Sequence, residues 1–165
     1  MEKRITIGNR VISEDSPAFI IAEMSANHNM DFDRAVAIMQ AAKDAGADAI
    51  KIQTYTADTI TLDCDDPCFQ ITQGTLWDGT TLHKLYETAY TPWEWQPKLK
   101  KIAEEMGLIF FSSPFDLSAV DFLEEMNVPA YKIASFEIND IPMIKKIAKL
   151  GKPMIFATGI AHLSD

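Results

Sequence analysis

The sequence is poor in cysteine and contains no long apolar run. Its two cysteines, Cys64 and Cys68, lie in the short segment CDDPC. A zinc site would need further Cys or His ligands close by, and this part of the sequence has none, so we expect free thiols. The first ten residues, MEKRITIGNR, hold no apolar leader, and no run approaches the roughly 18 apolar residues of a membrane helix. These absences predict a cytoplasmic protein without a membrane span.

Basic residues are also scarce. Lys and Arg total 15 against 24 Asp and Glu, which gives a formal net charge of −9 at pH 7. Nucleic-acid binding needs clustered basic side chains, and anionic membranes repel an acidic chain, so both kinds of partner are disfavoured. The glycine-rich phosphate motifs GxGxxG and GxxxxGK are absent, which argues against a nucleotide ligand. A small anionic ligand would have to be attracted locally, by a few buried lysines.

The chain alternates between strand-like and helix-like segments after a short hairpin around Gly8 and Asn9. Apolar runs predict buried strands, and apolar residues at helical spacing predict the helices between them. The predicted strands cover 18–25, 47–54, 108–115, 129–135 and 152–159, and the predicted helices cover 31–45, 93–106, 116–126 and 139–150. Such alternation is typical of a parallel sheet with crossover helices.

Two α/β architectures fit this pattern. Five strands cannot close an eight-stranded barrel, so the sheet is either an open doubly wound sheet or the first five β/α units of a (β/α)8 TIM barrel. We predict the second, with an N-terminal β-hairpin over 1–17 and an incomplete barrel domain over 18–165. The stretch 55–90 breaks the alternation, and long insertions in compact domains are usually functional. We expect it to form a partly helical cap over a site.

Polar residues recur at the C-terminal halves of the five predicted strands. In a barrel these positions converge on one mouth, where barrel enzymes keep their active sites. The residues are Glu23, Lys51, Gln53, Ser112, Ser113, Lys132, Ser135, Glu137 and Thr158.

Two of these residues, Lys51 and Lys132, sit among apolar strand residues. A buried ammonium group without a partner is strongly unfavourable, so each lysine needs a protein carboxylate or an anionic ligand. Glu23 and Glu137 would make structural ion pairs. Alternatively, the lysines and nearby serine hydroxyls would bind the phosphate or carboxylate of a small phosphorylated acid. A Schiff base formed by either lysine is the competing chemistry.

The histidines and tryptophans are less informative. His28 follows the first buried strand and is either a structural hydrogen-bonder, a proton shuttle or a sugar contact, and we include it among the sugar-binding candidates. We expect His83 on a helix surface. Trp77, Trp93 and Trp95 either line a sugar or pack in the core.

Five segments together resemble the sialic acid (N-acetylneuraminate) synthase family, from about Phe19 to the end of the chain. They read IIAEMSANHN, GADAIKIQTYTAD, GLIFFSSPFD, VPAYKIASFEIND and GKPMIFATGIA. The segment LWDGTTLHKLYETAYTPWEW is similar to the pseudaminic acid synthase branch. The resemblance implies condensation of phosphoenolpyruvate with an N-acetylated amino sugar to give a nonulosonic acid and phosphate. It also implies a divalent metal, usually Mn²⁺, a C-terminal antifreeze-like domain and a domain-swapped homodimer.

The resemblance assigns roles to individual residues. The motifs KIQT, SSPF and YKIAS place Lys51, Ser113, Lys132 and Ser135 as phosphoenolpyruvate ligands, and Gln53 as a sugar contact. Glu23 and Glu137 resemble the two acidic residues beside the reacting groups and are the predicted catalytic pair.

The sequence departs from the family in two respects. Many relatives have Ser where this chain has Ala157, so one ligand hydroxyl is lost or is replaced by Thr158 and the backbone. The family's metal-binding histidines lie on later strands, and no counterpart precedes Asp165. We therefore expect no metal ligand and no antifreeze-like domain in these 165 residues, which read as an N-terminal fragment inactive on its own. A Schiff-base aldolase and an inactive remnant that only binds ligand remain the alternatives.

Overall fold

The computed structural model describes residues 4–162. Residues 1–3 and 163–165, the outer ends of the two predicted regions, lie outside the described residues. The elements in chain order are β1 (Ile5–Ile7), β2 (Arg10–Ile12), β3 (Ile21–Glu23), α1 (Phe32–Asp44), β4 (Ala49–Thr54), α2 (Ala57–Ile60), η1 (Pro67–Phe69), α3 (Leu82–Ala89), η2 (Trp93–Trp95), α4 (Gln96–Glu105), β5 (Ile109–Pro114), α5 (Leu117–Glu125), β6 (Tyr131–Ile133), η3 (Ser135–Glu137), α6 (Ile141–Lys149) and β7 (Met154–Phe156).

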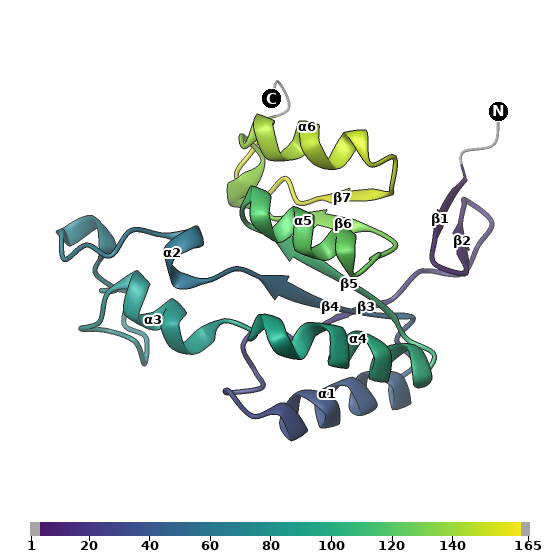
Figure 1. Ribbon diagram of the computed structural model, residues 1–165, viewed down its shortest axis with the longest axis horizontal. Helices are drawn as coiled ribbons and strands as arrows, with labels where there is room; N and C mark the ends of the chain where they lie inside the picture. The colour runs from purple at the N-terminus through teal and green to yellow at the C-terminus, as the bar shows by residue number, and fades with distance from the viewer. Residues whose placement is uncertain (1–3, 163–165) are drawn as a thin grey trace.

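Five parallel strands form the main sheet in the order β3-β4-β5-β6-β7. Each strand therefore lies beside the next strand in the chain, and α1, α4, α5 and α6 lie together against the sheet (Figure 1). A doubly wound sheet would reverse its strand order at a switch point. The sequential order shows instead a curled, singly wound sheet of the TIM-barrel type, which confirms the predicted fold class.

The helices begin and end where side-chain chemistry favours it. The carboxylate of Asp31 accepts a hydrogen bond from the Arg34 amide at 3.0 Å and caps α1. Asp116 caps α5 in the same way through the amides of Ser118 and Ala119. After α1 the chain turns at Gly46, whose φ of +86° is a left-handed conformation that favours glycine. The predicted helices 31–45 and 116–126 are thus confirmed to within a few residues.

Alternate residues of each central strand face opposite sides of the sheet. On the helix side, Ile50, Ile52 and Phe110 pack in one buried cluster with Met39 of α1 and Leu99 of α4. Burying each such side chain contributes roughly 1.5–3 kcal/mol to stability. Because this side is sealed by apolar packing, the opposite, concave side is left for polar side chains.

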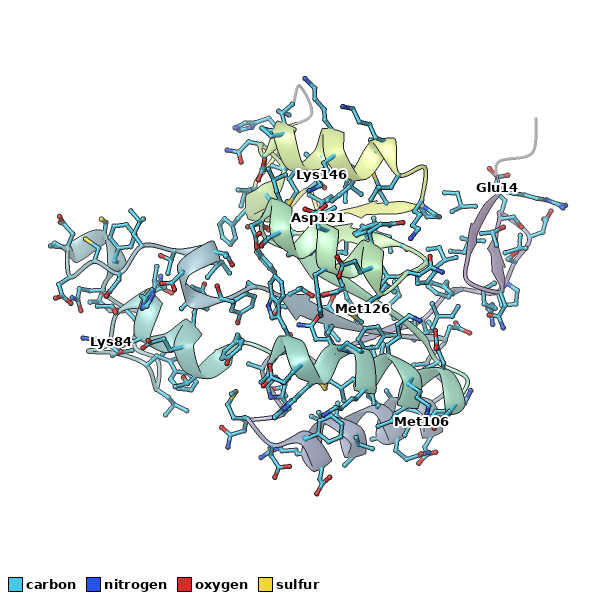
Figure 2. The ribbon with its side chains drawn as sticks, in the orientation of Figure 1. Glu14, Lys84, Met106, Asp121, Met126 and Lys146 are labelled. Atoms are coloured by element: carbon cyan, nitrogen blue, oxygen red, sulfur yellow. The ribbon has the colours of Figure 1, made fainter. Side chains whose placement is uncertain are left out.

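The outer helices are also joined by charge. Lys146 of α6 lies 2.6 Å from the carboxylate of Asp121 on α5. Figure 2 labels both residues on these neighbouring helices. The same ammonium group donates to the carbonyl of Leu117 at 3.0 Å. No helix within residues 4–162 is long and apolar enough to cross a membrane.

The N-terminal hairpin, β1 paired with β2, lies at the end of the sheet where the strands begin (Figure 1). Ile7 is 2% exposed and belongs to the same buried cluster as Ala49. A Cβ atom added to Gly8 would lie 3.1 Å from the Ile109 side chain, so glycine allows this close approach. Arg10 completes the attachment through an ion pair with Asp48 at 2.6 Å.

The first buried strand is shorter than predicted. The sequence predicts 18–25, whereas β3 covers Ile21–Glu23. The chain leaves the extended conformation at Ser25, where φ is +49°. Before Ile21, Phe19 packs against the cluster around Ala49 without belonging to a strand, whereas Ile20 is 52% exposed.

The insertion 55–90 projects beyond the end of β4 and contains α2, η1 and α3 (Figure 1). The prediction of a partly helical segment is therefore confirmed. The expectation for His83 was wrong: this side chain lies on α3 but is 7% exposed as a residue. Its Nε2 lies 2.8 Å from Asp58, on α2, and its Nδ1 lies 3.9 Å from Asp63. The Asp58 carboxylate hydrogen-bonds Nε2, and the Asp63 carboxylate places a second negative charge beside the buried ring.

We expect the packing of α2 on α3 to weaken as pH rises. The hydrogen bond with Asp58 raises the pKa of His83, burial opposes this, and the nearby carboxylates of Asp63 and Glu87 add to the rise. The stabilisation is therefore complete below the unfolded pKa of 6.5 and is lost as pH rises through the folded pKa. Amide protection factors across α2 should fall over this range.

The control is His83→Gln, which keeps a polar side chain of similar reach but does not titrate. Its protection factors should not change with pH over the same interval. Equal pH dependence in the wild type and in His83→Gln would contradict the prediction.

Candidate functional site

Strand register brings the predicted polar residues onto one face. Glu23 is in register with Lys51, and Gln53 is in register with Ser113. Because Ser112 pairs with Tyr131, the next residues along, Ser113 and Lys132, also share a face. This is the concave side, opposite the apolar cluster against α1 and α4. The structure thus gathers there the strand-end residues that the sequence singled out.

Lys51 carries a nearly buried charge at the centre of this face. The residue is 4% exposed, and its Nζ lies 3.4 Å from a Glu23 carboxylate oxygen. Burial lowers the pKa of Lys51, Glu23 raises it, and the positive charge of Lys132 lowers it again. The Glu23 side chain is 57% exposed, so its charge is partly screened by solvent. Lys51 thus has one partly solvated carboxylate as a direct partner and a second ammonium group, that of Lys132, within electrostatic range.

Lys132 and Glu137 do not form the direct ion pair that the sequence suggested. Within the described part of the chain, no carboxylate lies within ion-pair distance of Lys132. Burial raises the pKa of Glu137, while Lys132 lowers it from a distance and Asp140 raises it. The Oε2 atom of Glu137 is buried and has no hydrogen-bond partner. Both side chains are thus left with unused capacity to bind a ligand.

The two adjacent serines of β5 have different surroundings. Thr54 donates to the side-chain oxygen of Gln96 at 2.8 Å and accepts from Ser112 at 2.7 Å, on the helix side. Ser113 is fully buried on the concave side, and its hydroxyl has no partner. A buried hydroxyl without a hydrogen bond is unusual in a folded protein. Ser112 therefore serves the core, and Ser113 is available to a ligand.

Ser135 lies where the loops after β6 and β7 meet. It begins η3, and a Cβ atom added to Gly159 would lie 3.7 Å from the Ser135 Cβ. Ala157, where a family serine was expected, bonds through its amide to the Ile133 carbonyl at 3.0 Å. Thr158 is exposed. The backbone here is ordered by the sheet, and Ser135 supplies a half-buried hydroxyl two residues after β6.

The two predicted sugar contacts differ in accessibility. Gln53 is half-buried on the concave face. His28 is fully buried; its Nε2 lies 3.2 Å from the Thr91 hydroxyl, and its Nδ1 accepts from the Met30 amide at 3.1 Å. Burial lowers the pKa of His28. In this geometry His28 orders the loop after β3, and a direct sugar contact stays a prediction.

The three tryptophans differ in whether they pack in the core or border a cavity. Trp93 donates to the Tyr55 carbonyl at 3.1 Å, and the Trp95 ring packs edge-on against Phe32 at 5.5 Å, so both are structural. Trp77 is 51% exposed and borders a cavity of about 430 Å³ between the loop after β3 and the insertion.

Tyr86, on α3, is not among the residues predicted from the sequence, although it lies beside Tyr55, which follows β4. Burial raises the pKa of its hydroxyl, and the nearby Glu137 carboxylate raises it further. Its ring meets the Tyr55 ring edge-on, with centroids 5.4 Å apart. The signal in the sequence was the helical spacing of Leu82, Tyr86 and Ala89 inside the insertion.

The described residues do not fit a metal site. Within 4–162, no group of three or more His, Cys, Asp or Glu side chains lies close enough to hold an ion. Cys64 and Cys68 are free thiols, as predicted. The chemistry available to these residues is therefore anion binding, hydrogen bonding and proton transfer.

Comparison with known proteins gives consistent matches. A profile of the NeuB family matches residues 38–165. The chain is 50% identical over 155 residues to the pseudaminic acid synthase of Campylobacter jejuni subsp. jejuni serotype O:2, and 48% identical over 145 residues to that of Helicobacter pylori. These alignments cover 94% and 88% of this chain but only 44% and 42% of the relatives. The chain thus spans less than half the length of the curated relatives it matches.

Solved structures agree with the sequence matches. The N-acetylneuraminic acid synthetase of Leptospira borgpetersenii, solved in complex with citrate, superposes with a TM-score of 0.84 at 30% identity. That match covers 99% of this chain and 52% of the other. The spore coat polysaccharide biosynthesis protein SpsE of Bacillus subtilis has a TM-score of 0.77 at 35% identity, over 98% of this chain and 42% of the other.

We expect the two serines of β5 to respond differently to substitution. Ser112→Ala removes a hydroxyl that donates to Thr54 in the core and should lower the free energy of unfolding by about 1 kcal/mol. Ser113→Ala removes a buried hydroxyl that has no partner and should leave stability unchanged or higher. Urea unfolding of both variants measures this, and equal losses in the two would contradict it.

Proposed function

The chain belongs to the NeuB family, and on that premise we propose that the natural protein condenses phosphoenolpyruvate with an N-acetylated amino sugar. The products are a nonulosonic acid and phosphate, and the pseudaminic acid precursor is the proposed acceptor. The identity of about half of all residues to two pseudaminic acid synthases supports this choice among the sugars.

One observation carries the proposal: the concave face has more cation and donor capacity than its own carboxylates use. Lys51 and Lys132 lie on this face with one direct carboxylate contact between them, from Glu23. The buried Ser113 hydroxyl has no partner. Phosphoenolpyruvate carries a phosphate and a carboxylate, which are the groups that lysines and serine hydroxyls bind best. We assign Lys51, Ser113, Lys132 and Ser135 to this ligand.

The acceptor sugar is assigned to the rim of the same face. Gln53 is half-buried beside Ser113 in strand register and is proposed to hydrogen-bond the sugar. His28 is retained as a proposed sugar-site residue, acting through the loop that it orders. Glu23 and Glu137 are the proposed acid–base pair. Glu23 is solvent-accessible and ion-paired, so it suits the role of proton acceptor. Burial favours the protonated form of Glu137, so it suits the role of proton donor.

The proposed reaction forms one carbon–carbon bond and one carbon–oxygen bond to water, and it breaks the carbon–oxygen bond to phosphate. The methylene carbon of phosphoenolpyruvate attacks the open-chain sugar aldehyde, whose oxygen gains a proton from a carboxylic acid. Water adds to the neighbouring carbon and loses a proton to a carboxylate, and phosphate leaves with the oxygen that linked it. Lys51 and Lys132 hold the departing phosphate by charge, with no covalent bond to substrate.

The remaining proposals concern the whole protein. The family's divalent metal, Mn²⁺ in our proposal, would supply Lewis-acid chemistry from ligands outside residues 4–162, where no cluster fits it. We also propose a barrel domain over 18–165 preceded by the hairpin, an antifreeze-like domain elsewhere in the protein, and a domain-swapped homodimer. The free thiols Cys64 and Cys68 support a cytoplasmic location.

The test is phosphate release by the natural protein that carries this chain, supplied with Mn²⁺, phosphoenolpyruvate and the acceptor sugar. Lys132→Met should raise the KM for phosphoenolpyruvate at least about tenfold, because a charge-assisted contact is worth roughly 1.5–3 kcal/mol. The control is Lys101→Met, on α4, where the side chain is 78% exposed and should not affect KM. An unchanged KM in Lys132→Met would remove this lysine from the ligand site.

A second candidate is a Schiff-base aldolase, because burial lowers the pKa of Lys51 and so favours the neutral amine that this chemistry requires. Incubation with pyruvate and borohydride distinguishes the two functions. A stable adduct on Lys51 or Lys132 would support the aldolase and overturn the condensation. Ligand binding with neither adduct nor phosphate release would indicate a protein that only binds.

A further inference from the structure

A network of hydrogen bonds between buried side chains lies behind the strand ends, on the helix side of the sheet. Thr91, just after the insertion, is 1% exposed, and its carbonyl accepts from the side-chain amide of Gln96 at 3.1 Å. The side-chain oxygen of Gln96 accepts in turn from Thr54, and Thr54 accepts from Ser112. Gln96 begins α4, Thr54 ends β4 and Ser112 lies in β5. The segment that leaves the insertion is therefore tied to one helix and two strands.

His28 extends this network to the loop after β3. Its ring is fully buried, with Nε2 at 3.2 Å from the Thr91 hydroxyl and Nδ1 accepting from the Met30 amide at 3.1 Å. Because a backbone amide can only donate, Nδ1 must be unprotonated, and the ring hydrogen must lie on Nε2. The network is therefore complete only with a neutral His28 that donates to Thr91.

The surroundings of His28 favour this neutral form. Its neighbours from three segments are the Met30 amide, the Thr91 hydroxyl and the Trp95 ring, which it meets edge-on with centroids 5.7 Å apart. None of these groups carries a charge that would stabilise an imidazolium ion. Burial accordingly lowers the pKa of His28.

The loop after β3 has a conformation that needs such a restraint. Ser25, Asn29 and Met30 have φ values of +49°, +50° and +55°, in the left-handed region that residues other than glycine adopt at a cost. Conformations of this kind persist where the surrounding structure fixes them. The amide of Met30, one of the three strained residues, is the group that His28 holds.

We propose that His28, Thr91 and Gln96 are positioning residues that hold the rim of the concave face in one preformed conformation for the acceptor sugar. This inference deepens the proposed function and rests on it. A rim that is already ordered does not have to be ordered when the sugar binds, so the apparent affinity is higher.

The network reaches the acceptor end of the site and not the far end of the phosphoenolpyruvate site. Gln53 directly precedes Thr54, and the restrained loop directly follows Glu23. Lys132 and Ser135 lie in β6 and η3, which contribute no side chain to the network. We therefore expect its loss to weaken binding of the acceptor more than binding of phosphoenolpyruvate.

The experiment cuts the network where the loop meets the insertion. Thr91→Val keeps the shape of the side chain and removes the hydroxyl that accepts from His28. In the natural protein it should raise the KM for the acceptor sugar roughly three- to tenfold, the effect of losing one hydrogen bond. The KM for phosphoenolpyruvate should not change. Thr91→Ser keeps the hydroxyl and should restore the acceptor KM.

The matched control is Thr61→Val, the same chemical change within the insertion. The Thr61 hydroxyl has no hydrogen-bond partner within residues 4–162, so this variant should change neither KM. A loss of folded protein alone would lower the rate without separating the two KM values. If Thr91→Val leaves both KM values unchanged, or raises both equally, the positioning role is overturned while the proposed function stands.

Nitrogen NMR of the histidine rings tests the network without any variant. In the wild-type natural protein at about pH 6, where an exposed histidine is mostly charged, His28 should give a neutral ring with a slowly exchanging Nε2–H. A charged ring, or a hydrogen on Nδ1, would overturn the inference. If the wild-type protein releases no phosphate with any acetamido sugar, the proposed function fails and this inference fails with it, whatever the ring nitrogens show.

Discussion

A buried positive charge, the ammonium group of Lys51, is the constraint on which the polar face depends. In an apolar environment this group is tolerated only near compensating charge, and within the described residues its direct partner is the solvated carboxylate of Glu23. The helix side of the sheet is filled by apolar packing, so the charge has to lie on the concave side. The proposed anion site follows from that placement, because a bound anion would supply the charge that the protein lacks.

The second structural requirement is that the insertion be held against the sheet. Tyr55 does this through three different contacts: its hydroxyl bonds Ala89, its ring meets Tyr86, and its carbonyl accepts from Trp93. Two of these contacts join α3 to the end of β4, and the third joins η2 to it. The insertion therefore shares the geometry of the strands, although it contains few strand-like residues of its own. A surface appendage without such contacts would not place a side chain accurately over a binding site.

Much of the fold and part of the site could be predicted from the sequence. The alternation of apolar runs and capped amphipathic segments is a local property, so the predicted bounds of the strands and helices lie within a few residues of those in the structure. Strand-end positions were enough to gather Glu23, Lys51 and Lys132 on one face. What failed depended on three-dimensional neighbours. Strand-end position alone did not distinguish Ser112 from Ser113, which only the family resemblance separated, because the alternation along β5 assigns a face only when the register with Thr54 is known.

The wrong expectation for His83 has the same origin, and so do the contacts of His28 that the sequence did not indicate. His83 occupies a helical position that looks exposed, and its burial depends on Asp58 and Asp63, which lie some 20 residues earlier in the chain. His28 is satisfied by Thr91, 63 residues away. Pairings between residues so distant are set by how the insertion folds back, and no periodicity in a single sequence records that.

The hairpin beneath the sheet affects how strongly an anion is held. Ile7 and its neighbours pack against Ala49 and Ile109, where the strands begin, and so exclude solvent from that end of the concave face. An anionic molecule bound at the strand ends would then enclose Lys51 between the apolar residues under the hairpin and the negative charge of that molecule. The effective dielectric constant around that contact would fall as the molecule settles, and the attraction between the two charges would grow. The hairpin, with two strands of three residues each, would thus make Lys51 a stronger anion ligand than a lysine surrounded by water.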